Sequence, residues 1–241
     1  MTQVEIAVTI APEADITQKL QTELIDAQAA IDIIELRIDQ RQTIEIAEIE
    51  TLIAALRKSL PKVKLLITYR TASQGGNGNK AQESYYALLQ ELMQVQGYDM
   101  IDIEWEEAYK EKITELVAEA QAAGLEVVLS QHDFEETPAI EQLKFTYFKM
   151  SKTEADYLKL AVMPKDPEDV TYLLDALYVS SQSVKMKVVG ISMSHLGLVS
   201  RTAQGVFGGS ISYGCLGEPQ APGQIHVTKL KEILTLYESN K

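Results

Sequence analysis

Short apolar segments rich in β-branched residues alternate with longer segments of helical spacing along nearly the whole chain. The starts of the apolar segments recur roughly every 25–35 residues, about the length of one strand–helix unit of a parallel sheet. The predicted strands are Glu5–Ile10, Ile31–Ile38, Lys64–Tyr69, Met100–Glu104, Glu126–Ser130, Tyr157–Val162, Lys187–Ser192 and Gly209–Tyr213. The predicted helices are Ile16–Gln28, Thr43–Ser59, Gln82–Val95, Ala108–Ala123, Ala139–Met150, Pro167–Ser180, a short one near Leu196–Ala203, and Val227–Ser239. This alternation predicts an α/β protein with a parallel sheet.

The number of strand–helix units distinguishes between the two common parallel α/β folds. About eight units fit into 241 residues with no linker rich in Pro, Gly or Ser, which predicts a single (β/α)8 TIM barrel over residues 1–241. A dinucleotide-binding doubly wound sheet would place G-x-G-x-x-G after the first strand. Here Ile10 is followed by A-P-E-A-D, without glycine.

Composition narrows the range of partners and compartments. A formal net charge of −13 argues against nucleic acid and anionic membranes, because both attract positively charged surfaces. The chain has no signal-peptide pattern and no apolar run of about 18 residues, so we expect a soluble cytoplasmic protein. Cys215 is the single cysteine, which excludes an intrachain disulfide and is expected to be a buried structural residue.

Ionisable residues occur where a barrel would place its catalytic groups. These are the C-terminal ends of the strands, at positions that point inward. The residues concerned are Glu35, Arg37, Asp39, Arg70, Asp102, Glu104, His132, Lys159 and Arg201. Each of them could be structural if taken alone. Together they would crowd charges into one end of a barrel, which is poor for stability, and this favours a functional site.

Lys159 lies inside the apolar segment Tyr157–Val162 and suggests the chemistry. Burial near arginines lowers the pKa of a lysine, and a neutral amine can attack a carbonyl group. A histidine such as His132 can then transfer protons. Arginines at the rim favour a substrate with a carboxylate. The pattern therefore predicts imine-forming carbonyl chemistry on an anionic substrate.

Two other catalytic chemistries find little support. The chain has three histidines, but neither H-x-H nor H-E-x-x-H, so we expect no metal site. The G-x-S-x-G elbow of serine hydrolases is also missing.

At these residues the sequence resembles type I 3-dehydroquinate dehydratase. The matching segments are E-L-R-I-D (Glu35–Asp39), T-Y-R-T (Thr68–Thr71) with Gly75–Gly76, S-Q-H-D-F (Ser130–Phe134), Y-L-K-L-A-V-M-P (Tyr157–Pro164), S-M-S-H-L-G-L-V-S-R (Ser192–Arg201), V-F-G-G (Val206–Gly209) and A-P-G-Q (Ala221–Gln224). The resemblance implies a TIM-barrel enzyme, usually a homodimer. Such an enzyme converts 3-dehydroquinate to 3-dehydroshikimate in the shikimate pathway, toward aromatic amino acids, without metal or cofactor.

The resemblance also implies roles for individual residues. Lys159 matches the Schiff-base lysine, and His132 matches the general acid/base. Matches to substrate-binding positions are Glu35, Arg37, Arg70, Arg201 and Gln224. Thr9 falls where the family often has a small hydroxyl residue.

Two glutamines near the predicted site depart from the family pattern. Gln74 stands where many members have a glutamate, and a neutral amide cannot supply that charge beside His132. Gln220 stands where a serine is common. We expect both to contact the substrate or its neighbours.

Two alternatives remain open from the residues alone. A class I aldolase or transaldolase-like barrel also uses a strand lysine, and the Gly205–Gly209 turn is compatible with the phosphate site that such enzymes have. A barrel that binds a ligand without catalysis would share the same fold.

Overall fold

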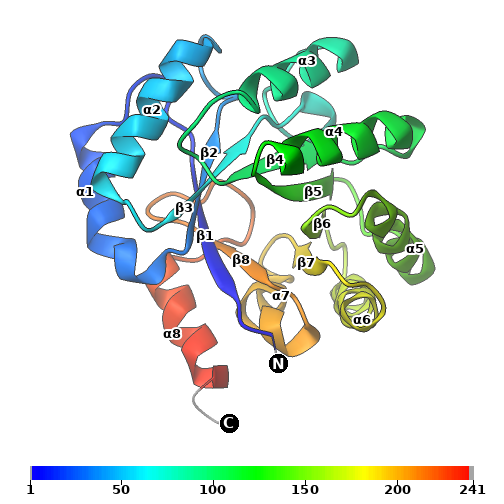
Figure 1. Cartoon of the computed structure of the whole chain (residues 1–241). Coiled ribbons are helices and arrows are strands. Elements are labelled where there is room, and N and C mark those ends of the chain that lie inside the picture. Colours follow the sequence, from blue (N-terminus) through cyan, green and yellow to red (C-terminus); the bar gives the residue numbers. More distant parts are fainter. Residues whose placement is uncertain (1, 239–241) are drawn as a thin grey trace.

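The computed structural model describes residues 2–238, in which eight parallel strands surround a common axis and helices cover the outside (Figure 1). The strands are β1 (Glu5–Ile10), β2 (Ile33–Arg37), β3 (Lys64–Thr68), β4 (Met100–Glu104), β5 (Glu126–Asp133), β6 (Tyr157–Val162), β7 (Lys187–Ser192) and β8 (Ile211–Gly214). The helices are α1 (Gln18–Ala27), α2 (Ile46–Ser59), α3 (Gln82–Leu92), α4 (Lys110–Ala122), α5 (Ile140–Met150), α6 (Pro167–Ser183), α7 (Leu198–Thr202) and α8 (Val227–Glu238). The predicted end of the last helix, Ser239, lies outside the described residues.

The strands follow the order β7-β6-β5-β4-β3-β2-β1-β8, and every pair along it is parallel. The two terminal strands approach each other through a bridge between Val188 and Gly209. There the N–H of Ser210 donates to the Val188 carbonyl at 2.9 Å. The sheet is therefore a nearly closed barrel, and the predicted TIM-barrel fold is confirmed.

Side chains alternate between two buried layers. On β6, Leu158 and Leu160 belong to the apolar cluster between the barrel and its helices, whereas Tyr157 and Ala161 belong to the cluster inside the barrel. Because both faces of such a strand are buried, its sequence is apolar except for Lys159. The alternation places Lys159 on the inward face.

The ends of four strands (β2, β3, β5 and β8) differ from the sequence prediction, and the differences at β5 and β8 have clear physical reasons. β5 extends to Asp133 because it continues to pair with β6 through His132 opposite Ala161. His132 is therefore held in a strand and does not lie in the loop after it. β8 begins at Ile211. Before it, Gly208 has the left-handed φ of +85°, and this turn delays the start of regular pairing.

The N-terminal end of the barrel is closed by a set of charged side chains of alternating sign. Glu5, Lys64, Glu126 and Lys187 come from the first residues of the odd-numbered strands. Lys64 Nζ lies 3.1 Å from Glu5 and 2.7 Å from Glu126, and Lys187 Nζ lies 3.7 Å from Glu5. We call these four residues the floor.

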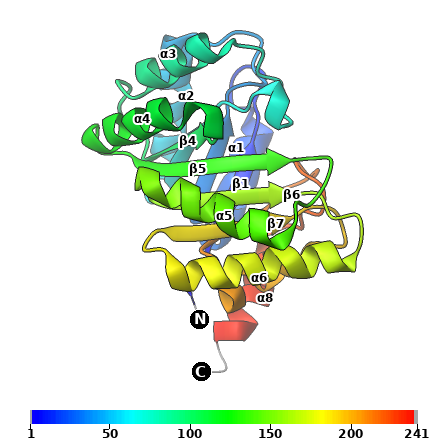
Figure 2. The same cartoon turned by 90° about the vertical axis from the view of Figure 1, so that its right-hand side faces the viewer.

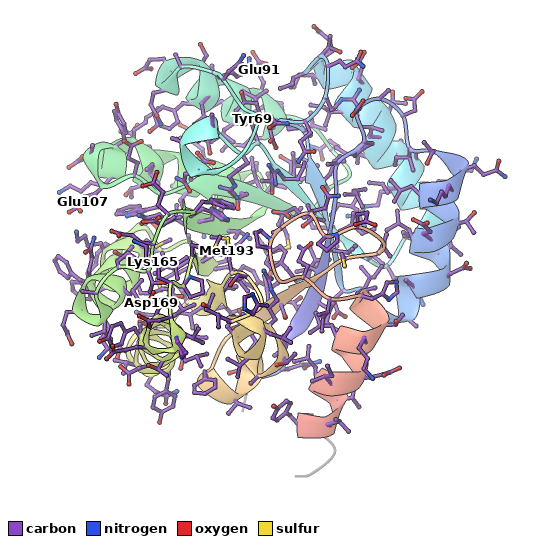
Figure 3. All side chains as sticks on the ribbon, turned by 180° about the vertical axis from the view of Figure 1, so that it is seen from behind. Tyr69, Glu91, Glu107, Lys165, Asp169 and Met193 are labelled. Carbon is purple, nitrogen blue, oxygen red and sulfur yellow. The ribbon has the colours of Figure 1, made fainter. Side chains whose placement is uncertain are left out.

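The loops that follow the strands gather at the opposite end of the barrel (Figure 2). Seen from behind, the segment between β8 and α8 crosses this mouth, near the labelled Met193 (Figure 3). Within residues 2–238, no helix is long and apolar enough to span a membrane.

Candidate active site

The mouth of the barrel contains a cavity of about 100 Å³. Its lining residues are Thr9, Glu35, Arg37, Arg70, Gln74, Gly75, His132, Phe134, Lys159, Ala161, Ile191, Met193, Arg201, Tyr213, Gln220, Ala221 and Gln224. The structure thus brings around one cavity all ten residues that the family resemblance assigned to the site or its neighbourhood. Asp39, Asp102 and Glu104, which the strand pattern also singled out, are not part of the lining. Tyr213 and Met193 also line the cavity, although the sequence had not assigned them to the site. The signal for Tyr213 was its place at the end of the last predicted strand.

Lys159 is 5% exposed, and among the residues described no carboxylate lies within 4.0 Å of its amine. Its Nζ lies 4.1 Å from the centre of the Tyr213 ring. Burial lowers the pKa of Lys159, and the charges of Arg70 and Arg37 lower it further, while Glu35 and Asp102 oppose the shift. The net effect is a larger fraction of neutral, nucleophilic amine than an exposed lysine has.

His132 is held by the side-chain carbonyl of Gln74. Gln74 Oε1 accepts the backbone N–H of His132 at 3.0 Å and lies 3.3 Å from Nδ1. The Gln74 amide nitrogen donates to the Trp105 carbonyl at 3.4 Å, which fixes the orientation of the amide. An Nδ1–H that donates to Gln74 leaves Nε2 free to accept a proton.

The charge state of His132 follows from its surroundings. Burial lowers its pKa well below the ordinary value, and the charges of Arg70, Lys159 and Arg37 lower it further. The lowered pKa therefore favours the neutral form of His132.

Glu35 is the carboxylate on the inward face of β2. Its oxygens accept the hydroxyls of Thr9 at 2.6 Å and Thr68 at 3.0 Å. Burial raises the pKa of Glu35, but the charges of Lys159 and Arg37 outweigh it and the pKa is lowered. Glu35 is therefore an ionised group in the wall of the cavity.

Two of the three arginines at the cavity are already paired with carboxylates. Arg37 makes a bidentate pair with Asp39, at 2.7 and 2.8 Å. Arg70 is held by Asp102 and Glu104, each at 2.9 Å. The strand pattern had identified these acidic residues as neighbours on one face, but not as partners of Arg70.

Arg201 differs from the other two arginines. It is 1% exposed, and no carboxylate in residues 2–238 lies within ion-pair distance of it. Its guanidinium donates to the carbonyls of Tyr213 at 3.4 Å and Pro222 at 2.9 Å. Burial lowers its pKa to about 10. A buried guanidinium that contacts only carbonyls retains an unbalanced positive charge, to which an anionic ligand is chemically suited.

The segment between β8 and α8 forms the outer wall of the cavity. Gln224 Oε1 accepts the backbone N–H groups of Gln220 at 2.8 Å and Ala221 at 3.3 Å. Gly223 has a φ of +80°, and a Cβ there would lie 2.1 Å from the Ser194 carbonyl. Glycine is therefore required for the segment to approach the β7 end. The side chain of Gln220 is largely exposed at the edge of the site.

The remaining histidines and the cysteine lie apart from the cavity lining. His226 contacts the Thr228 hydroxyl at 2.8 Å. Cys215 is buried, and burial raises the pKa of its thiol. In the described part of the chain, no group of three or more His, Cys, Asp or Glu residues is arranged to hold a metal ion.

Comparison with known proteins gives a consistent result. The family model for type I 3-dehydroquinase matches residues 6–241. The chain is 61% identical to 3-dehydroquinate dehydratase of Staphylococcus carnosus over 100% of both chains. The crystal structure of 3-dehydroquinate dehydratase from Geobacillus kaustophilus has a TM-score of 0.90 at 25% identity, covering 100% of this chain and 93% of that one.

A second solved structure is equally similar in fold. It is the type I 3-dehydroquinate dehydratase from Clostridium difficile with covalent modified comenic acid. It has a TM-score of 0.90 at 29% identity, covering 100% of this chain and 94% of that one. The chain therefore belongs to the type I 3-dehydroquinase family of hydro-lyases.

Proposed function

We propose that this chain dehydrates 3-dehydroquinate to 3-dehydroshikimate, as a step of the shikimate pathway, through an imine between the substrate and Lys159. The observation that carries the proposal is a buried amine with a lowered pKa, in one cavity with a neutral histidine and an arginine free of carboxylates. Cavity and groups match the needs of a ketone substrate with a carboxylate.

The first half of the reaction forms the electron sink. The neutral amine of Lys159 adds to the C3 ketone, and the resulting carbinolamine takes up one proton and loses water to give an iminium. The iminium withdraws electrons from the C2–H bond and so acidifies it. His132 removes that proton, and the electron pair of the bond forms an enamine.

The second half expels the hydroxyl group. The electron pair of the enamine moves to break the C1–O bond, and His132 returns its proton to the departing oxygen, which leaves as water. Hydrolysis of the iminium consumes one water, releases one proton and frees the amine. The balance over the cycle is the loss of one water from the substrate.

Arg201 is proposed to bind the substrate carboxylate, because its guanidinium has no other anion to pair with. The further proposed substrate contacts are Glu35, Arg37, Arg70 and Gln224, with Thr9, Gln74 and Gln220 at the periphery of the cavity. Gln74 also sets the tautomer of His132 through its carbonyl. Its neutral amide leaves the charge of a protonated His132 uncompensated, which suits a base that must release its proton quickly.

Reduction with borohydride during turnover tests the imine. Wild-type protein treated with 3-dehydroquinate and borohydride is expected to gain a substrate-derived mass on the peptide that contains Lys159. Full turnover without an adduct at Lys159 would exclude the imine. An assay at the ultraviolet absorbance of the conjugated enone product separates this enzyme from a barrel that only binds a ligand.

Assembly as a homodimer in the cytoplasm, which the family resemblance implies, is also proposed. Sedimentation analysis measures the assembly, and a monomer at micromolar concentration would contradict it.

A further inference from the structure

The even-numbered strands place four polar residues at one level inside the barrel. Alternate strands of such a barrel contribute to common layers of four side chains. Here the layer consists of Glu35 from β2, Asp102 from β4, Lys159 from β6 and Tyr213 from β8. All four side chains are buried. The contact of Lys159 with the Tyr213 ring confirms that these two side chains meet.

Two members of this layer have a buried polar atom without a hydrogen-bond partner among the described residues, the Tyr213 hydroxyl and Asp102, and Asp102 is the carboxylate of the two. It is fully buried, and its Oδ1 accepts the Ser130 hydroxyl at 2.8 Å and an Arg70 nitrogen at 2.9 Å. Its Oδ2 is buried and has no hydrogen-bond partner among the described residues. Both oxygens of Glu35, in contrast, accept hydroxyls. A buried carboxylate oxygen without a partner is costly, so it suggests a role in another state of the site.

The charges around Lys159 do not balance while its amine is neutral. Arg70 is the only cation that pairs with Asp102 and Glu104 in residues 2–238, so this trio carries one excess negative charge. Glu35 adds a second, because Arg37 is neutralised by Asp39. A positive charge at Lys159 offsets part of this excess.

We propose that Asp102 is the fixed counterion of the cationic iminium at Lys159. The inference rests on the proposed imine chemistry. The neutral amine, the ketone and one proton give the iminium and one water, so a full positive charge appears at a nitrogen that had none. Because Lys159 and Asp102 are both buried, a carboxylate held in place in advance stabilises the iminium more than the neutral amine. Asp102 acts through its field, since it lies beyond 4.0 Å from Nζ.

The charged groups on the strands around Lys159 shift its pKa in directions that agree with this assignment. Burial has the largest effect on its pKa and lowers it, Glu35 and Asp102 raise it, and Arg70 and Arg37 lower it. His132 is neutral on β5. Glu104 shares Arg70 with Asp102 but is not among the charges that affect the pKa of Lys159 most. This difference provides a matched control.

The test compares Asp102→Asn with Glu104→Gln. Each variant removes one of the two carboxylates that hold Arg70, and each keeps the shape of the side chain. The first measurement, without substrate, is the pH dependence of the reaction of Lys159 with trinitrobenzenesulfonate, located by peptide mass. The second is kcat together with the fraction of enzyme trapped by borohydride at saturating 3-dehydroquinate.

Asp102→Asn is expected to move the midpoint of the Lys159 reaction to lower pH, since an opposing negative charge is lost. It is also expected to lower kcat roughly 10- to 100-fold, because the iminium loses its counterion. Glu104→Gln should leave the midpoint where it is in the wild type. The combination of a more reactive Lys159 amine and slower turnover distinguishes loss of the counterion from a looser hold on Arg70, because both variants remove one carboxylate partner of Arg70.

The inference is overturned if Asp102→Asn leaves the midpoint unchanged or if both variants move it equally. Asp102→Ser, which can still accept the Ser130 hydroxyl, serves if the asparagine variant does not fold, with the same expected direction. If borohydride traps no adduct in the wild type, the proposed imine itself would be contradicted. The two failures are therefore distinguishable.

Discussion

The two ends of the barrel both carry charged side chains, but they differ in whether the lysines and arginines are paired with carboxylates and exposed to solvent. At the floor, Lys64 and Lys187 each lie against a glutamate, and the side chains remain partly exposed. At the mouth, Lys159 and Arg201 are buried, and within residues 2–238 neither has a carboxylate at ion-pair distance. The charges of the floor are paired within the protein, whereas we propose that a substrate binds to these two basic side chains at the mouth. This is the division between stability and activity that barrels of this type show.

The largest expected effect comes from removing the amine at the mouth. Lys159→Ala should reduce kcat by about 10⁴-fold or more, because the electron sink cannot form. Its stability should be unchanged or slightly raised, since a buried amine without a carboxylate partner costs free energy. The enone assay and thermal unfolding measure the two quantities. Normal turnover by this variant would contradict the proposed function.

Arg201→Met tests the proposed carboxylate site. The loss of a charged hydrogen-bonding group from a buried site costs about 2–4 kcal/mol of binding, so kcat/KM should fall roughly 30- to 10³-fold, mainly through KM. Arg37→Met, which removes an arginine already paired with Asp39, is the comparison and should have the smaller effect. Equal losses would show that pairing does not distinguish these arginines.

The pH profile tests His132 as the base. Its lowered pKa places the acidic limb of kcat below about 6.5, the ordinary pKa of histidine, and protonation along that limb removes the base. Gln74→Glu adds a negative charge beside Nδ1, raises the pKa of His132 and should move the limb to higher pH. A limb at or above the ordinary histidine value in the wild type would contradict the lowered pKa of the half-buried His132.

The same shift affects stability. Below pH of about 6.5 the unfolded chain binds a proton at His132 that the folded chain binds only at lower pH. The free energy of unfolding should therefore decrease as pH falls from this value toward the folded pKa, and His132→Asn should reduce that dependence. Chemical denaturation across this range measures it, and an identical slope in the variant would contradict the depressed pKa.

The smallest effect is expected at the floor. Glu126→Gln removes the charge that Lys64 contacts at 2.7 Å, and partly exposed ion pairs contribute about 0–1 kcal/mol. Stability should fall within that range, and kcat should stay near the wild-type value. A loss of activity comparable to that of Arg201→Met would show that the two ends are not independent.

Much of the fold could be predicted from the sequence because strand periodicity is local. On β6, the outward position of Leu158 and the inward position of Tyr157 follow from the alternation of successive residues in a strand. The end of β5 was missed, because its extension depends on pairing of His132 with Ala161 in another strand. The strand pattern assigned no role to Tyr213, because its inward position becomes informative only when its contact with Lys159 is known.

The sequence by itself determined which side chains point into the barrel, because a strand turns successive residues to opposite faces whatever its neighbours are. Only the tertiary structure decided which of those side chains are partners. The stagger between strands sets whether Arg70 meets Asp102 and Glu104, and whether Arg201 meets any carboxylate. The physical reason is the range of the forces: backbone geometry acts between adjacent residues, whereas ion pairing and desolvation depend on groups that closure of the barrel brings together.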